Sequence, residues 1–320
     1  MNSIILSALI GVAMMLSGIL VKRSAVVQLI AITGSFILLG GSIMDLISCQ
    51  QAHHYFKMIE LNRFSAWFNV LMSGCGMMYI LLFHRQLARI GKNDAEYFAL
   101  IFFILCGVYL LSMYSNLLIL FIGIEILSIP QYILSGADKN SLKSNEAALK
   151  YFLMGSFSTG ILLMGITLLY GATGTFDLLN PSFLKAFQAG AGTSSLALVG
   201  VLLLVVAFGF KTSSAPFHFW TPDVYDGAPT PFTPFMASVV KVTVFLAFIR
   251  LFHFSFRDMA TSWQLMLAVM IALTLLVGNV TAVYQQSVKR MLAYSSIAQA
   301  GFMLFAVFAT NASSWDGIIL

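Results

Sequence analysis

Residues 209–242, GFKTSSAPFHFWTPDVYDGAPTPFTPFMASVVKV, decide the fold, because proline interrupts an otherwise apolar pattern there. Five of the seven prolines of the chain lie between Pro216 and Pro234. Proline lacks the backbone N–H of a helix and clashes with the preceding turn, so a continuous helix cannot cross this stretch. The stretch predicts two half-helices joined by irregular backbone, with Lys211 before the break and Lys241 after it.

The sequence around this break has the composition of a membrane protein. Of its 320 residues, 59% are hydrophobic and 9% are charged, and the mean hydropathy is +0.91. A water-soluble domain needs more polar surface than that. A bilayer core needs about 20 apolar residues per helix, and the sequence predicts an all-α, polytopic membrane helix bundle of about ten such helices. They span 2–21, 25–46, 64–83, 97–114, 117–135, 147–171, about 194 to 211, 232–252, 262–284 and 291–310.

The predicted break also bears on function. Irregular backbone at membrane depth is tolerated only where protein or a watery cavity covers it, so a proline-broken helix indicates a transporter. A second internal feature is the run 97–137, which is too long for one span and contains a single charged residue, Glu125. Ser115 and Asn116 predict a tight turn that divides this run and leaves Glu125 in the middle of a helix.

The basic residues predict orientation rather than a nucleic-acid partner. The formal charge is +5, but the lysines and arginines are spread over short loops instead of lying on one face. With the N-terminus outside, nine of them fall in cytoplasmic loops and five in outer loops, which agrees with the usual cytoplasmic excess of positive charge. The nine are Lys22, Arg23, Arg85, Arg89, Lys92, Lys139, Lys143, Lys289 and Arg290, and the five are Lys57, Arg63, Lys185, Arg250 and Arg257.

Three ionisable residues lie inside predicted spans: Glu125, Lys211 and Lys241. An ion at mid-bilayer costs about 2.5–3.5 kcal/mol, so such groups usually face a cavity, a partner or a proton path. Glu125 is either a carboxyl group neutralised by burial or the partner of Lys211 on another helix. Lys211 could also reach an interface, whereas Lys241 is too deep for that. Desolvation favours the neutral form of a lysine, whereas a nearby carboxylate favours the charged form. A carboxylate that approaches or departs could therefore make the lysine bind or release a proton.

His218, Lys150 and two aspartates are weaker candidates. His218 follows Lys211 within the broken segment and is either a relay between the two lysines or a structural histidine. Lys150 is near a predicted span boundary, where it is either an anchor or the cytoplasmic end of a proton path. Asp223 and Asp226 in PDVYDG could suggest a hydrolytic carboxylate pair or a metal site, but turn chemistry explains them equally well.

The sequence carries no motif for a nucleotide or a redox group. It contains no GxGxxG, no Walker P-loop, no CxxCH and no cysteine cluster. Cys49, Cys75 and Cys106 have no metal or redox spacing and are predicted to be structural. We therefore expect no cofactor and no metal in this chain, and we expect any redox chemistry to take place elsewhere.

Four segments resemble the antiporter-like subunits of respiratory complex I. They are FIGIEILSIPQYIL (121–134), LKYFLMGSFSTGILLMG (149–165), the stretch 209–242 and VKRMLAYSSIAQAGF (288–302). The form WTPDVYDGAPTP is most similar to the subunit N type of bacterial NADH-quinone oxidoreductase, which is the chain 2 type of mitochondria and chloroplasts. The resemblance covers essentially the whole chain.

The resemblance implies roles for residues already singled out. In that family the glutamate of the GIE motif and the lysine before PFHFW form a pair, and here these residues are Glu125 and Lys211. The lysine after the proline-rich segment, here Lys241, is the central lysine of a proton path. Lys150 and His218 are implied to lie along the same polar axis.

The resemblance also implies an antiporter-like fold of two inverted five-helix repeats within about fourteen helices. Applied to this sequence, 1–96 is a peripheral three-helix segment, 97–252 is the first repeat, and 253–320 is the start of an incomplete second repeat. The second broken helix and its lysine are not in these 320 residues. We therefore expect a fragment or one part of a split protein.

The implied function is proton translocation by a multi-pass subunit of complex I in a bacterial inner membrane, driven by quinone reduction in a neighbouring arm. NADH, flavin, iron–sulfur clusters and quinone are then expected in partner subunits, and the expected partners are antiporter-like and quinone-module subunits. A cation/proton antiporter subunit or a membrane-bound hydrogenase subunit shares the same lysines. The remaining alternative is a non-conducting scaffold whose buried charges serve only packing and assembly.

Overall fold

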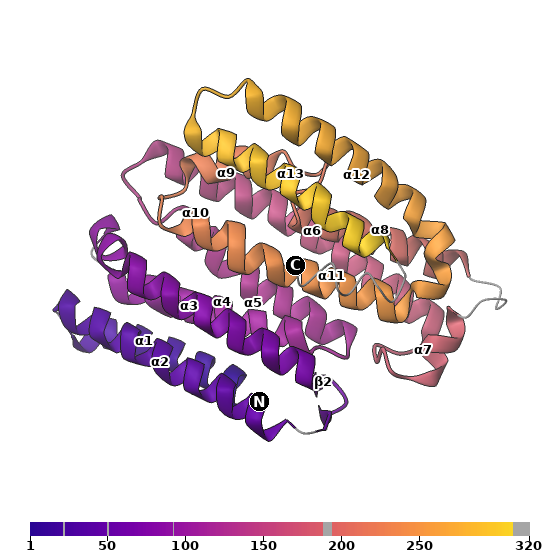
Figure 1. Ribbon diagram of the computed structural model, residues 1–320, viewed down its shortest axis with the longest axis horizontal. Helices are drawn as coiled ribbons and strands as arrows, with labels where there is room; N and C mark the ends of the chain where they lie inside the picture. Colours follow the sequence, from indigo (N-terminus) through magenta and orange to yellow (C-terminus); the bar gives the residue numbers. More distant parts are fainter. Residues whose placement is uncertain (22, 50, 92, 188–193, 310–320) are drawn as a thin grey trace. The chain divides into compact units, whose positions relative to one another are not determined.

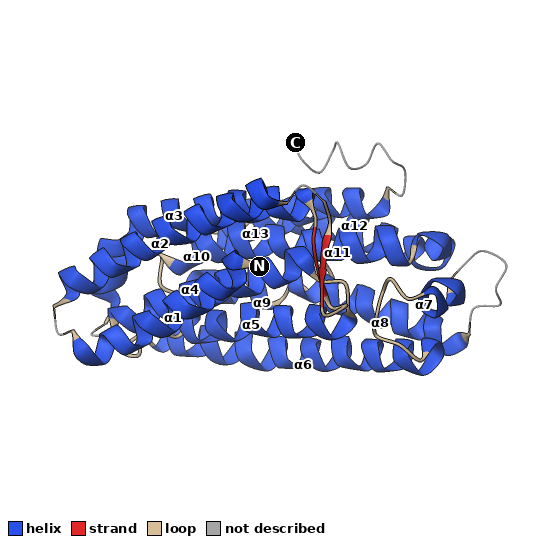
Figure 2. Cartoon of the chain, turned by 90° about the horizontal axis from the view of Figure 1, so that it is seen from below, coloured by secondary structure: helices blue, strands red, loops and turns tan. Residues whose placement is uncertain are grey.

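The computed structural model describes the chain except for residues 22, 50, 92, 188–193 and 310–320. The described residues form helices and one short β-hairpin (Figure 2). In chain order the elements are α1 (Asn2–Leu20), α2 (Ser24–Ser48), β1 (His53–Tyr55), β2 (Ile59–Leu61), α3 (Arg63–Ile90), α4 (Asp94–Met113), α5 (Leu117–Ser135), α6 (Leu142–Thr173), α7 (Pro181–Ala186), α8 (Ser195–Lys211), α9 (Trp220–Gly227), α10 (Phe232–Phe235), the π-helical segment η1 (Met236–Val240), α11 (Lys241–Ser255), the 3-10 turn η2 (Arg257–Met259), α12 (Ala260–Val283) and α13 (Val288–Phe308).

The prediction of about ten membrane helices is confirmed. Nine helices in the described part of the chain are long and apolar enough to cross a membrane, and Ser195–Lys211 is a shorter apolar helix. The predicted boundaries agree with the structure within three residues, except that α3 continues to Ile90 and α6 begins at Leu142. The predicted end of the last helix at 310 lies outside the described residues, as do Lys22 and Lys92.

The chain divides into two compact units. Unit 1 comprises Met1–Leu149 and Ala228–Thr243, and unit 2 comprises Lys150–Gly227 and Val244–Leu320. The boundaries between the units cut through α6 and α11. Compactness measures packing and does not detect a repeat, so the assignment of 97–252 as a first repeat stays a prediction.

Within unit 1, α4 is the central helix. It packs against α1, α2, α3 and α5 (Figure 1). Of its most apolar window 83% is buried, against 28% for α1 and 39% for α2 and for α3. β1 and β2 connect α2 to α3 as an antiparallel pair with His53 opposite Leu61, and the N–H of Ser115 between α4 and α5 donates to the carbonyl of Met58 (3.0 Å). The first three helices are therefore the less buried part of this unit.

A buried carboxylate fixes the beginning of α1. Asp45, on α2, is 2% exposed and accepts hydrogen bonds from the backbone N–H groups of Asn2 (3.1 Å) and Ser3 (2.9 Å). The first amides of a helix have no partner inside the helix, and the N-terminal end of the helix dipole favours a negative charge. Asp45 therefore satisfies donors that lipid could not satisfy. Its position at the end of a predicted span gave no sign of this role.

Within unit 2, α12 and α13 are adjacent, α8 packs on α12, and α9 packs on α13 (Figure 1). A Cβ atom at Gly278 would lie 2.8 Å from the amide nitrogen of Ala298, so α12 and α13 approach closely through a small residue. The sequence predicted Arg250 in an outer loop because it lies near the end of a predicted span. That prediction is wrong, since Arg250 lies within α11 and is 9% exposed. The reason is that α11 continues to Ser255 and carries Arg250 on a buried face.

Candidate functional site

The predicted break in the helix is confirmed. α8 ends at Lys211, and α9 begins only at Trp220. The last carbonyl groups of α8 find donors in the chain that follows, so no helical continuation is needed to satisfy them. The Thr212 hydroxyl donates to Phe208 C=O (2.8 Å), and the indole N–H of Trp220 donates to Phe210 C=O (3.1 Å). Ser214 N–H donates to Gly209 C=O (2.8 Å).

Thr274 of α12 holds the broken segment in place. Its hydroxyl oxygen accepts a hydrogen bond from the backbone N–H of Ala215 (2.9 Å), and the side chain is fully buried. Ala215 lies between the two half-helices, where its N–H has no helical partner. The bond joins residues 59 apart in the sequence, so no local pattern could have predicted it.

Polar atoms gather in the broken segment. Among the described residues, five buried side-chain nitrogen or oxygen atoms have no hydrogen-bond partner, and three of them belong to Ser213, His218 and Thr221. His218 lies in the turn between α8 and α9 and is 6% exposed. Lys211 occupies the last turn of α8, where the helix dipole favours a cation. The break therefore carries groups that can donate and accept hydrogen bonds at a place where lipid-facing helices offer none.

Lys241 lies near the middle of the membrane span Phe232–Ser255, as predicted. It is 6% exposed and directly follows the π-helical segment Met236–Val240. A π-helical turn widens the hydrogen-bond spacing of a helix and frequently occurs at functional sites. The span is 83% buried over its most apolar window, which makes it one of the two most buried spans in the described part of the chain. The sequence placed Lys241 at this depth but did not predict the π-helical segment.

Glu125 lies near the middle of α5 and is half-buried. The turn before α5 forms where the sequence predicts it, because the Asn116 side chain accepts from Leu118 N–H (2.9 Å) and caps the helix. α5 then approaches α4 closely, since a Cβ atom at Gly107 would lie 2.8 Å from the amide nitrogen of Leu127. Pro130 has no N–H, so it cannot donate the usual helical hydrogen bond to the carbonyl of Ile126, which is next to Glu125.

The predicted site residues divide between the two compact units. Glu125 and Lys241 belong to unit 1, whereas Lys150, Lys211 and His218 belong to unit 2. The pairing of Glu125 with Lys211 therefore stays a prediction. Both residues nevertheless lie where the sequence predicts them, Glu125 near the middle of α5 and Lys211 at the end of α8.

The structure gives Lys150 a partner that the sequence did not reveal. Its ammonium group lies 2.7 Å from Asp223 Oδ2, and the guanidinium of Arg290 lies 2.9 Å from Asp223 Oδ1. Asp223 lies in α9, outside the helices long enough to span a membrane. Burial alone would raise the pKa of its carboxyl group, but the hydrogen bonds and charges of Lys150 and Arg290 outweigh burial and lower that pKa. Asp223 is therefore ionised at neutral pH.

Turn chemistry does not account for the two aspartates of PDVYDG. Both lie in the helix α9, and both bind the beginning of α13. The Asp226 carboxylate accepts a hydrogen bond from the Ser287 hydroxyl (2.8 Å). No group of three or more His, Cys, Asp or Glu side chains in the described residues could hold a metal ion. Within the described residues, these carboxylates bind basic and hydroxyl side chains.

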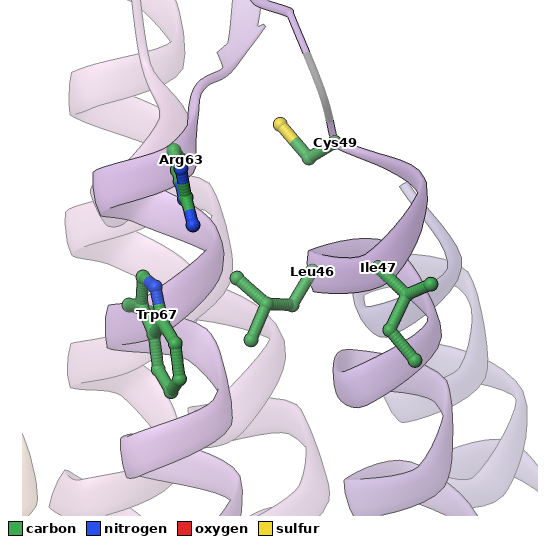
Figure 3. A pocket seen from close by; sticks show the side chains of 5 residues that line it. All are labelled: Leu46, Ile47, Cys49, Arg63 and Trp67. Carbon is green, nitrogen blue, oxygen red and sulfur yellow. The ribbon is translucent and has the colours of Figure 1, made fainter.

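One hollow of about 440 Å³ lies between the end of α2 and the beginning of α3 (Figure 3). Figure 3 shows its lining side chains, and none of them is a predicted site residue. Cys49 in its wall is buried, and burial raises the pKa of its thiol. A protonated thiol is a poor nucleophile and a poor metal ligand, which favours the structural role predicted for this cysteine. The lining residues are Leu46, Ile47, Cys49, Arg63 and Trp67.

Comparison with known proteins identifies the family. Residues 115–320 match the family described as NADH:quinone oxidoreductase/Mrp antiporter, transmembrane. The chain belongs to this family. The match includes the helix that carries Glu125, the broken segment and the helix that carries Lys241.

Individual relatives agree with this assignment. The chain is 41% identical to NADH-quinone oxidoreductase subunit N of Cytophaga hutchinsonii over 95% of its own length and 65% of the relative's length. It is similar to a chain of respiratory complex I from Thermus thermophilus with a TM-score of 0.79 and 32% identity, covering 97% of this chain and 65% of that chain. A chain of the Mrp complex from Dietzia has a TM-score of 0.82 at 18% identity, covers 96% of this chain and 58% of that chain, and shows a shared fold.

The chain thus has the predominantly helical, multi-span fold of antiporter-like membrane subunits. It spans about half to two thirds of the length of the curated relatives, 65% of the Cytophaga relative and 53% of one from Trichlorobacter lovleyi.

Replacement of Thr274 by valine should loosen the broken segment. Valine has nearly the same shape but no oxygen, so Ala215 N–H would be left buried and unpaired at a cost of about 1–3 kcal/mol. We expect faster amide hydrogen–deuterium exchange across 209–221, measured by mass spectrometry. Thr274→Ser keeps the hydroxyl group and serves as the control. Equal exchange in Thr274→Val and the unsubstituted protein would contradict the assigned role.

Proposed function

We propose that this chain is a proton-translocating membrane subunit of NADH-quinone oxidoreductase, in which quinone reduction elsewhere in the complex drives protons through these helices. The observation that carries the proposal is Lys241, buried near the middle of a highly buried span and next to a π-helical segment. A buried lysine at this depth is costly and is typical of an ion or proton pathway. Family membership and the subunit N relatives support the same conclusion.

The chemistry requires residues that change charge inside a low-dielectric environment. A buried lysine is stabilised as an ammonium ion by a nearby carboxylate and as a neutral amine by desolvation. In this mechanism Glu125 and Lys211 form the switching pair, and the departure of one charge alters the charge balance at Lys241. His218 lies in the turn after Lys211, and an imidazole can pass a proton near neutral pH.

The proposal places the redox chemistry outside this chain. NADH, flavin, iron–sulfur clusters and quinone would be held by partner subunits, and the chain would contribute to the oxidoreductase as its proton-conducting part. Its partners would be further antiporter-like and quinone-module membrane subunits. Its location would be a bacterial inner membrane with the N-terminus outside, as the distribution of loop lysines and arginines predicts.

Removal of the Lys241 amine should abolish proton translocation while leaving the complex assembled. We expect Lys241→Met to reduce proton flux per electron by roughly 100-fold, the order of effect for a positioned proton-transfer group. Lys241→Arg is the matched control, because arginine keeps the positive charge but does not release its proton. Flux should be lost in both variants, as measured by pH-dye quenching in vesicles that contain the intact complex.

A scaffold role gives the opposite pattern. If Lys241 serves only packing, Lys241→Arg should retain normal proton flux, and Lys241→Ala should reduce the amount of assembled complex without changing flux per complex. Quantification of assembled complex on native gels separates the two results.

Glu125→Gln and Lys211→Met test the predicted pair. Each variant should lower proton flux, and the double variant should lose less than the sum of the single losses in free energy, because interacting residues are not additive. Double-variant flux equal to the product of the single effects would show that the two residues act independently. Unchanged flux in both single variants would remove them from the path.

A cation/proton antiporter subunit is the second candidate, because the matched family also includes Mrp antiporters. Sodium is the distinguishing variable. An NADH-quinone oxidoreductase subunit of the proposed type should give the same proton flux with and without external sodium at constant ionic strength. Proton movement that requires a sodium gradient would favour the antiporter.

A further inference from the structure

The half-helix α9 is attached to two different helices through its carboxylates. Asp223 binds Arg290 of α13 (2.9 Å) and Lys150 of α6 (2.7 Å). Asp226 also binds the beginning of α13, through the Ser287 hydroxyl on its carboxylate (2.8 Å) and the Lys289 ammonium on its backbone carbonyl (3.4 Å). Among the described bonds of these two carboxylates, the one that reaches α6 runs from Asp223 to Lys150.

The two cations on Asp223 are not equivalent. The guanidinium of Arg290 is planar and stays protonated at any physiological pH, so it is a permanent partner. The amine of Lys150 is carried on a flexible four-carbon stem and can lose its proton in a suitable environment. The Lys150 and Arg290 side chains are 42% and 37% exposed in this chain. Asp223 therefore has one fixed partner and one exchangeable partner.

A chain of side-chain contacts connects these ion pairs to the break between α8 and α9. Tyr151, the residue after Lys150, stacks on Trp220 at the beginning of α9 with ring centroids 4.6 Å apart and an interplanar angle of 9°. The indole of Trp220 in turn donates to the carbonyl of Phe210, next to Lys211 (3.1 Å). Lys150 and Tyr151 thus touch α9 at two adjacent places, and α9 touches the last turn of α8.

Lys150 and Arg290 both lie in the N-terminal parts of their helices. α6 has 32 residues and is about 48 Å long, whereas the bilayer core is about 30 Å thick, so its ends extend beyond that core. Arg290 lies in the first turn of α13. All three charged side chains are partly exposed in this chain.

We propose that Asp223 is the positioning residue for Lys150: its carboxylate holds the Lys150 ammonium at the loop end of the broken helix, and Arg290 keeps that carboxylate in place whenever Lys150 leaves. This inference rests on the proposed proton translocation, to which it adds a docking group for the lysine at one end of the path. Lys150 is then neither a lipid anchor nor an isolated charge. Arg290 maintains an ion pair with α9 in both positions of Lys150.

Amine acylation measures the docking directly and does not depend on pumping. In the assembled complex, Asp223→Asn should raise the acylation rate of Lys150 several-fold, as followed by peptide mass spectrometry with Lys139 as the internal reference. Asp223→Glu should restore protection. Arg290→Gln should not raise the rate, because Asp223 would then have Lys150 as its remaining described cation partner. Unchanged acylation of Lys150 in Asp223→Asn would overturn the docking.

Proton flux per electron tests the positioning role. Asp223→Asn should lower flux by about tenfold, and Asp223→Glu should recover most of it. Asp226→Asn is the matched control and should retain nearly normal flux, since it removes a carboxylate charge from the same short helix and the described bonds of Asp226 go to Ser287 and Lys289. Equal losses in Asp223→Asn and Asp226→Asn would reduce the contact to a structural one and overturn the proposal.

The same measurements separate the two levels of inference. If Lys241→Met leaves flux unchanged, the proposed function itself fails. If Lys241→Met abolishes flux while Asp223→Asn leaves both flux and Lys150 acylation unchanged, only the role of Asp223 fails.

Discussion

A backbone group inside a membrane must find its hydrogen-bond partner within the protein, because lipid offers none. This requirement explains the long helices, and it also explains what happens where proline ends a helix. Between Lys211 and Trp220, hydroxyl, amide and indole groups of the same segment replace the missing helical bonds. Thr274 supplies one further acceptor from α12. Irregular backbone is therefore stable here, and it exposes polar groups that a regular apolar helix would not carry.

The charged residues differ in how far they are buried. Lys241 is almost fully buried within a span, where a charge is costly. Lys150, Asp223 and Arg290 are partly exposed, so their ion pairs cost less desolvation. The break between α8 and α9 is connected to these ion pairs through Trp220 and Tyr151.

Several features could be predicted because they depend on short stretches of sequence. Apolar runs of fixed length marked the helices within three residues at most ends, and the cluster of prolines marked the break. The depth of Glu125 and Lys241 followed from their positions along those runs. The prediction that Arg250 lies in an outer loop was wrong, because α11 continues beyond its predicted end and the Arg250 side chain is buried there. The π-helical segment before Lys241 was not predicted, since no local residue pattern distinguishes it from an α-helix.

By itself, the sequence determined that this protein is a helical membrane protein with a broken helix and a few ionisable residues inside its spans. Hydropathy and the missing N–H of proline are properties of neighbouring residues, so these features need no knowledge of the fold. Only the tertiary structure decided which groups satisfy the break and which carboxylate holds Lys150. Those partners are 59 residues apart for Ala215 and Thr274, 73 for Lys150 and Asp223, and 67 for Asp223 and Arg290. Hydrogen bonds and ion pairs act over a few ångströms in space, and chain folding alone brings such distant residues within that range.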